Sequence, residues 1–184
     1  ALRAAWLPGV RILIGILAVV FGVQLATRAI WLGASSGQLL ASAWILWMMG
    51  TPLEARWGAR RFLLFAGACA LGSALAVLAL SRGGAAPVLD GAGIAFGVLV
   101  AYTINAPLQK VRLLLWPVPV WILAVLLGAL ELVLLCLGGS LAAAGHLAGG
   151  LVALTWIGRE RSRSRRQGRG KDGPLGFVEM GDGP

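Results

Sequence analysis

The sequence has few of the residues on which soluble enzymes and metalloproteins depend. Among its 184 residues only seven are acidic, two are cysteine, one is histidine and one is tyrosine. Both cysteines, Cys69 and Cys136, fall in apolar runs, where they act as small apolar residues and indicate neither a disulfide framework nor a metal site. Charged residues make up 12% of the chain and hydrophobic residues 59%. This composition excludes an ordinary water-soluble domain and indicates an integral membrane protein.

Long apolar runs predict several membrane-spanning helices, since about 20 apolar residues cross the hydrocarbon core as a helix. The runs are continuous and lack the alternation of β-barrel strands. We therefore predict an all-α polytopic membrane protein with six helices, at residues 12–26, 38–53, 62–81, 91–105, 120–137 and 141–157. Five spans are the alternative, because only Gly138, Gly139 and Ser140 separate the last two helices.

The positive charges favour the even number of spans, because Lys and Arg in short loops stay on the cytoplasmic side. With six spans and a cytoplasmic N-terminus, every Lys and Arg except Arg28 and Arg82 lies on that side. Five spans would put either the basic tail or the loop at residues 56–61 on the opposite side. The heavy use of Ala, Gly, Arg and Trp is typical of GC-rich bacterial genomes. The prediction is a bacterial inner-membrane protein with both termini cytoplasmic.

The composition changes abruptly after residue 157, where arginines replace the apolar residues. We predict a transmembrane domain over residues 1–157 and a basic, flexible cytoplasmic tail over residues 158–184. Each basic residue near an anionic membrane surface contributes about 1 kcal/mol, so membrane lipids are one predicted partner. No aromatic residue is interleaved with the arginines to stack on bases, so nucleic acid is not.

Four motifs, in order and spacing, resemble the rhomboid family of intramembrane serine proteases. The most specific, GTPLEARWGARRFLLF, is similar to the family's junction between its second and third helices. It is followed by GAGIAFGVLVAY, VRLLLWPVPVWILAVLLGALEL and GHLAGGLVAL, and the resemblance covers about residues 38–156. It implies a six-helix rhomboid-like bundle. At the junction we expect Pro52 to end one helix and Gly58 to permit a tight return.

The resemblance also implies a catalytic serine and histidine, and here the chain departs from the family. The serine position is Ala92, whose methyl group cannot attack a carbonyl, whereas His146 falls on the family's histidine. The family's two oxyanion-stabilising positions, histidine and asparagine, are here Gln38 and Ser42. A designed knockout would change one position rather than three. We therefore predict a natural pseudoprotease and no enzyme activity; the alternative is a rhomboid protease captured as a Ser-to-Ala variant.

Two polar residues inside predicted spans have more than one interpretation. The lone histidine, His146, is either a neutral imidazole hydrogen-bonded within the bundle, to Tyr102 or a water, or a functional group. Glu131 is costly in lipid, so we expect a neutral carboxyl bonded to a neighbouring helix or a contact with another subunit. No cofactor is predicted; ligation of a haem or pigment by His146 is the one exception considered.

Small residues predict where the helices approach closely. Gly93 and Gly97 on the fourth helix, and Gly145 and Gly149 on the sixth, are spaced as in helix-packing motifs, so these two helices should touch.

Tryptophans predict an outward-facing surface. Trp44 and Trp47 on the second helix are expected to face lipid or a partner. A transporter is disfavoured because no inverted repeat is visible. The predicted function is to bind transmembrane helices of other membrane proteins, either as an accessory or structural subunit of a larger membrane complex or as a client binder.

Overall fold

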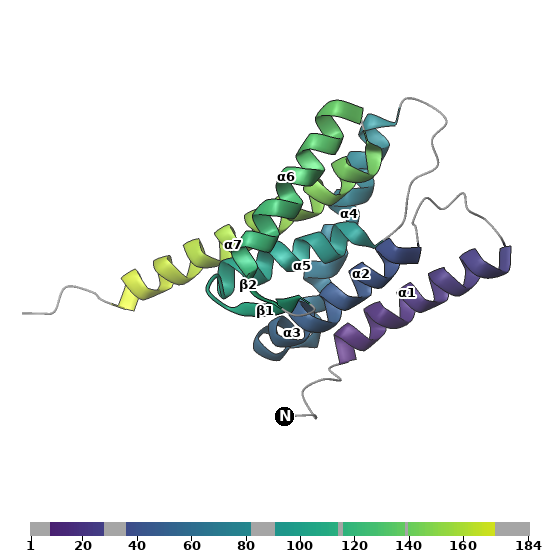
Figure 1. Cartoon of the computed structure of the whole chain (residues 1–184). Helices are drawn as coiled ribbons and strands as arrows, with labels where there is room; N and C mark the ends of the chain where they lie inside the picture. Colours follow the sequence, from purple (N-terminus) through teal and green to yellow (C-terminus); the bar gives the residue numbers. More distant parts are fainter. Residues whose placement is uncertain (1–7, 28–35, 82–90, 114–115, 139, 172–184) are drawn as a thin grey trace, which may run out of the picture.

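Helices make up almost all of the computed structural model, which describes residues 8–27, 36–81, 91–113, 116–138 and 140–171 (Figure 1). The elements are α1 (Pro8–Thr27), α2 (Ser36–Ile45), a π-helical turn η3 (Leu46–Gly50), α3 (Thr51–Trp57), α4 (Ala59–Leu80), α5 (Ala92–Asn105), β1 (Lys110–Leu113), β2 (Trp116–Pro119), α6 (Val120–Gly138) and α7 (Leu141–Lys171). The predicted all-α fold is confirmed. Each predicted helix corresponds to one helical segment, with α2, η3 and α3 together forming the second.

Three helices are long and apolar enough to cross a membrane by length and composition: Ala59–Leu80, Val120–Gly138 and Leu141–Ser162. Pro8–Val19 and Ala92–Asn105 are shorter apolar helical stretches. Helix α5 lies at the centre of the bundle and packs against α2, α4, α6 and α7 (Figure 1). Small and apolar residues occupy the first three turns of α5, which lets it pack against neighbours on most sides.

The buried core joins α5 to η3, α3 and α4. Phe62 and Phe65 on α4, and Met49 on η3, are fully buried. Phe65 contacts two indole rings edge to face, with ring centroids 5.3 Å from Trp57 and 5.9 Å from Trp156. These aromatic contacts connect α3, α4 and α7 at one end of the bundle.

The prediction that Pro52 ends the second helix is wrong. The chain stays helical through Pro52 and on to Trp57, because the π-helical turn η3 ends at Gly50, two residues before the proline. Proline lacks the N–H that would bond to the carbonyl four residues earlier, and the wider turn accommodates this missing bond. Thr51 also donates its hydroxyl to the carbonyl of Trp47 at 2.6 Å. The turn itself comes at Gly58, whose φ of +81° favours glycine, as predicted.

Glu54 is a buried carboxylate that holds the start of α1. Its side chain accepts hydrogen bonds from the backbone N–H groups of Gly9 and Val10, both at 2.7 Å. These N–H groups have no partners within the helix, and a negative charge is favoured at a helix N-terminus. Glu54 is 1% exposed, so both bonds form away from water. The carboxylate therefore fixes the start of α1 against α3.

Glu54→Gln should lower the free energy of unfolding by about 2 kcal/mol, because an amide offers one acceptor oxygen where the carboxylate offers two, and bonds to charged groups are strong. Reversible unfolding in mixed micelles measures this loss. Glu160→Gln is the matched control. That side chain pairs with Arg61 at a partly exposed site, so its loss should stay below about 1 kcal/mol. Equal stabilities of the two variants would contradict the role given to Glu54.

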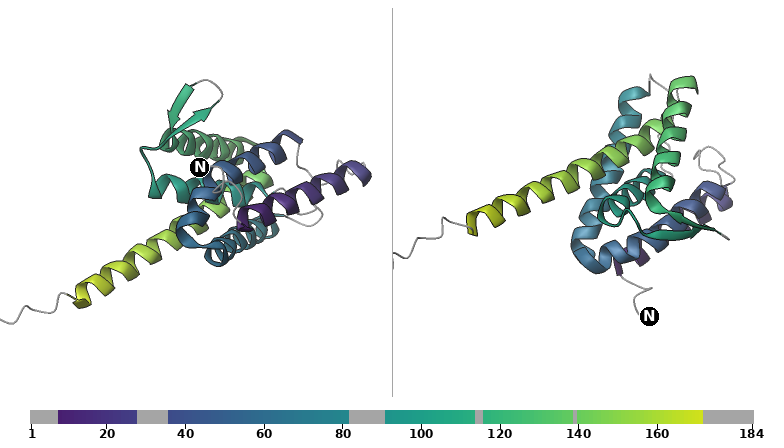
Figure 2. Two further views of the ribbon diagram at one scale, coloured as in Figure 1. Left: turned by 90° about the horizontal axis from the view of Figure 1, so that it is seen from below. Right: turned by 60° about the vertical axis from the view of Figure 1, so that its left-hand side comes forward.

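A two-stranded antiparallel hairpin, which the sequence did not predict, connects α5 to α6 (Figure 2). Lys110 pairs with Pro119 and Leu113 with Trp116. The hairpin is short because proline cannot donate to a strand ladder. The N–H of Val120 donates to the carbonyl of Gln109 at 3.0 Å, which joins the hairpin to the first turn of α6.

The boundary predicted at residue 157 does not coincide with a helix end. Helix α7 continues to Lys171 and extends past the rest of the bundle (Figures 1 and 2), so residues 158–171 of the predicted tail are helical. Two contacts hold its first exposed turn: Glu160 pairs with Arg61, and Arg161 donates to the carbonyl of Ile104 at 2.8 Å. The rest of the predicted tail, residues 172–184, lies outside the described residues.

The same contacts place several chain segments at one end of the bundle. Glu54 joins α3 to the start of α1, Arg61 joins the start of α4 to α7, and Arg161 joins α7 to the end of α5. The first turn of α1 and the exit of α7 therefore share an end, as expected for an even number of spans. Which side of a membrane this end faces stays a prediction.

Candidate functional site

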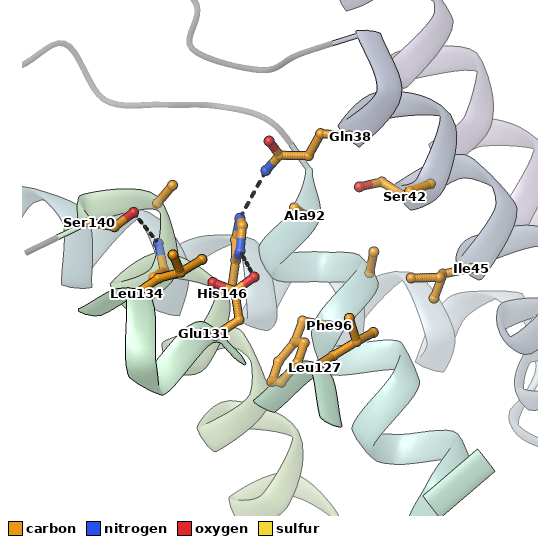
Figure 3. Close-up of a pocket in the computed structure, with 14 residues that line it drawn as sticks. Gln38, Ser42, Ile45, Ala92, Phe96, Leu127, Glu131, Leu134, Ser140 and His146 are labelled. Carbon is orange, nitrogen blue, oxygen red and sulfur yellow. Dashed lines mark hydrogen bonds and ion pairs between the residues drawn. The ribbon is translucent and has the colours of Figure 1, made fainter. Parts of the chain in front are cut away.

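Helices α2, α5, α6 and α7 enclose a cavity of about 340 Å³ (Figure 3). Most of its lining is apolar, from residues such as Ile45, Phe96 and Leu127. The polar residues in the lining are Gln38, Ser42, Glu131, Ser140 and His146. A mostly apolar cavity with a few converging polar groups is typical of binding and active sites.

His146 is the centre of a hydrogen-bonded chain that crosses the cavity (Figure 3). Its side chain is nearly buried on α7, and Nδ1 lies 2.8 Å from Oε1 of Glu131 on α6. Nε2 lies 3.3 Å from the amide nitrogen of Gln38 on α2. An amide nitrogen can only donate, so Nε2 accepts, and the imidazole donates its Nδ1–H to the carboxyl oxygen. Glu131 thereby fixes the tautomer of His146, as the acid of a catalytic triad does.

Both interpretations of these two polar residues can now be compared with their contacts. His146 is hydrogen-bonded inside the bundle, but to Gln38 and Glu131 rather than to Tyr102. Glu131 is hydrogen-bonded to a neighbouring helix, which was the first of the two interpretations given for it above. Its contact with another subunit concerns a partner chain and stays a prediction.

Ala92, the first residue of α5, lines the same cavity as His146 (Figure 3). It follows Gly91, whose φ of +69° turns the chain sharply into the helix. Gln38 and Ser42, one turn apart on α2, line the facing wall. The structure thus brings together all four positions that the resemblance assigned to a catalytic site. Position 92 presents a methyl group there.

The cavity has two serines with different surroundings. Ser140 precedes α7 and accepts a hydrogen bond from the N–H of Ala143 at 3.3 Å, so its hydroxyl caps the helix. Ser42 lies inside α2 and is 3% exposed. The chemistry available is therefore a base, His146 supported by Glu131, beside a position with no attacking oxygen.

Helices α5 and α7, which both line the site, are in close contact, as the glycine spacing predicted. A Cβ atom placed on Gly97 would lie 3.1 Å from the carbonyl oxygen of Gly149 and 2.6 Å from the sulfur of Cys69. One placed on Gly145 would lie 2.8 Å from the hydroxyl of Ser73. On Gly149 it would overlap the carbonyl group of Gly93. Only glycine lets these backbones approach so closely.

Gly149→Ala should destabilise the bundle by about 2 kcal/mol, because its methyl group would push α7 away from the α5 backbone. Thermal unfolding in detergent measures the loss. Gly158→Ala on the same helix is the control: an added methyl meets nothing within 4 Å, and alanine favours helix by up to about 1 kcal/mol. The two substitutions should therefore shift the melting temperature in opposite directions; a shift in the same direction would contradict the close contact.

The two tryptophans singled out on the second helix differ in exposure. Trp47 is 50% exposed, which agrees with a position facing lipid or a partner. Trp44 is half-buried and packs against the core, so the structure places it only partly on the outer surface. Among the described residues, no group of three or more His, Cys, Asp and Glu side chains comes together to hold a metal ion.

Apolar helices of membrane-spanning length, with a cavity that holds several polar side chains, define a helical membrane protein with an internal site. The Rhomboid domain family matches residues 12–161, and the chain belongs to the rhomboid family. It is accordingly an integral membrane protein. Comparisons with curated proteins and with solved structures found no match.

Proposed function

We propose that this member of the rhomboid family is a pseudoprotease that binds transmembrane helices of other membrane proteins without cleaving them. One observation carries the proposal: Ala92 places a methyl group in the cavity of His146, where the family has its serine. Without that oxygen no acyl-enzyme can form.

The other family positions add support. Removing a single oxyanion donor typically lowers the rate 10²- to 10³-fold, and Gln38 and Ser42 replace both of the family's donors. Replacement of one catalytic residue is enough to inactivate a protease for structural work, whereas three family positions differ in this site. What remains is a membrane bundle with a mostly apolar cavity that holds a few polar side chains. Such a bundle suits an accessory or structural subunit of a larger membrane complex, or a client binder, in the bacterial inner membrane with both termini cytoplasmic.

The second candidate function is a rhomboid protease whose serine was replaced by alanine. One observation favours it: His146 still has an acid partner in Glu131 at 2.8 Å, the arrangement of a working general base. If the chain is a protease captured as a variant, Ala92→Ser alone should restore efficient cleavage. If it is a pseudoprotease, Ala92→Ser alone should not.

Purification of the full chain from its own membranes in mild detergent tests the proposal. We expect one or more membrane proteins in fixed ratio, which re-associate with the purified chain in proteoliposomes. Cleavage of a model transmembrane substrate by the unaltered chain, or a covalent adduct with a fluorophosphonate probe, would overturn the proposal. So would a failure of every co-purified protein to re-associate.

A further inference from the structure

The cavity reaches the outer surface of the bundle between α2 and α6. Ala41 on α2 and Leu134 on α6 both line the cavity, and both are exposed, Leu134 by 45%. Gly37, one turn before Ala41, is exposed as well. Small residues on one wall let another helix approach closely. A helix lying in the bilayer against α2 and α6 could therefore direct a side chain into the cavity.

The size of the cavity limits what can enter. A membrane-spanning helix of about 20 residues is about 30 Å long and about 10 Å across. A cavity of about 340 Å³ is far too small for such a helix and has room only for side chains. A docked helix would stay in the lipid and insert a side chain.

Ser42 indicates that the inserted group forms a hydrogen bond. Its side chain lines the cavity and is 3% exposed, and Figure 3 shows its hydroxyl directed into the cavity. Within the described ranges the Ser42 hydroxyl has no hydrogen-bond partner. A buried polar group without a partner costs about 1–3 kcal/mol. A ligand that accepts from Ser42 would remove this cost.

Glu131 offers the complementary group on the opposite wall. Its Oε1 bonds to His146, and no partner of Oε2 lies within the described ranges. The Ser42 hydroxyl can donate a hydrogen bond, and Oε2 of Glu131 can accept one. The chemistry of the cavity therefore fits a group with both a donor and an acceptor.

We propose that the cavity binds the carboxamide side chain of an Asn or Gln in a partner transmembrane helix that docks against α2 and α6. The amide oxygen accepts from Ser42 and the amide N–H donates to Glu131. This inference rests on the proposed function, since it names the kind of helix that the chain recognises. It assigns recognition to two residues, Ser42 and Glu131, that lie on facing helices.

The test uses synthetic apolar helices of about 20 residues, each with one central guest residue, and the full chain in lipid nanodiscs. Asn, its near-isostere Leu, and Asp are compared as guests, with the guest moved along the helix to cover each depth. Energy transfer between labelled chain and helix gives the dissociation constant. Hydrogen bonds between membrane helices contribute about 0.6–1.7 kcal/mol, so the best Asn helix should bind about threefold to eighteenfold more tightly than its Leu counterpart.

Two substitutions separate recognition from general packing. Ser42→Ala should abolish the preference for Asn without lowering the melting temperature, because the hydroxyl has no partner to lose within the described residues. Thr155→Ala, which removes an exposed hydroxyl from α7, should retain the preference.

The outcomes distinguish this inference from the proposed function. Equal binding of Asn and Leu helices would overturn the inference and leave helix binding intact. A preference for Asp, or a preference for Asn that survives Ser42→Ala, would overturn it as well. Failure of every guest helix to bind would count against the proposed function itself.

Discussion

Ala92→Ser alone should leave the chain a very poor protease, even though it restores the family's nucleophile beside His146. Glu131 already fixes the imidazole, so the new hydroxyl would meet a working base. The developing oxyanion would still lack the family's histidine and asparagine. The Gln38 amide already donates to His146 and the Ser42 side chain is shorter than asparagine, and each missing donor costs about 10²- to 10³-fold in rate. Cleavage of a fluorogenic transmembrane substrate in proteoliposomes measures the effect.

Adding Gln38→His and Ser42→Asn to Ala92→Ser should raise the cleavage rate at least about 10²-fold over the single variant, because both oxyanion donors return. His146→Ala in this triple background is the control, and it should abolish cleavage by removing the base. Efficient cleavage by Ala92→Ser alone would contradict the prediction and favour the protease captured as a variant. A triple variant no faster than the single one would show that the site has lost more than these groups.

Much of the fold could be predicted because local signals determine it. Apolar runs set the helices, and Gly58 marked the return between α3 and α4 because its positive φ suits glycine alone. The errors arose where tertiary contacts decide. Pro52 should have ended a helix, but a π-helical turn accommodates it. The arginines after residue 157 resemble a disordered tail, yet contacts of Glu160 and Arg161 with other helices hold the first turn of the extension.

The site was predicted in part. Ala92 and His146 line one cavity as the resemblance implied, because helix packing through Gly93 and Gly149 brings α5 and α7 together. The pairing of Glu131 with His146 was not predicted. A signal for it existed, since Glu131 lies seven residues before Gly138 and His146 six residues after Ser140, and antiparallel helices place such positions at nearly the same height. Whether the two side chains face each other, however, depends on how α6 and α7 pack, and the sequence separation does not determine this.

Glu131→Leu should lower the free energy of unfolding by about 4 kcal/mol. The substitution removes the acceptor of the Nδ1–H of His146 and leaves the imidazole buried in a mostly apolar cavity. Breaking a buried polar pair by removing one partner is strongly destabilising. Titration of the folded chain with denaturing detergent, followed by tryptophan fluorescence, measures the loss. Leu130→Ala, at an exposed position on the same helix, is the control and should change stability by less than about 1 kcal/mol.

The double variant Glu131→Leu with His146→Leu should recover most of that stability, because an apolar pair leaves no buried group without a partner and such replacements are often neutral. A double-mutant cycle then isolates the pair interaction from the two individual losses. If the two substitutions simply add, Glu131 and His146 do not interact in the folded chain. A large coupling energy would show that Glu131 supports His146 as a base. A supported base beside a position without a nucleophile is what the proposed pseudoprotease should retain from a protease ancestor.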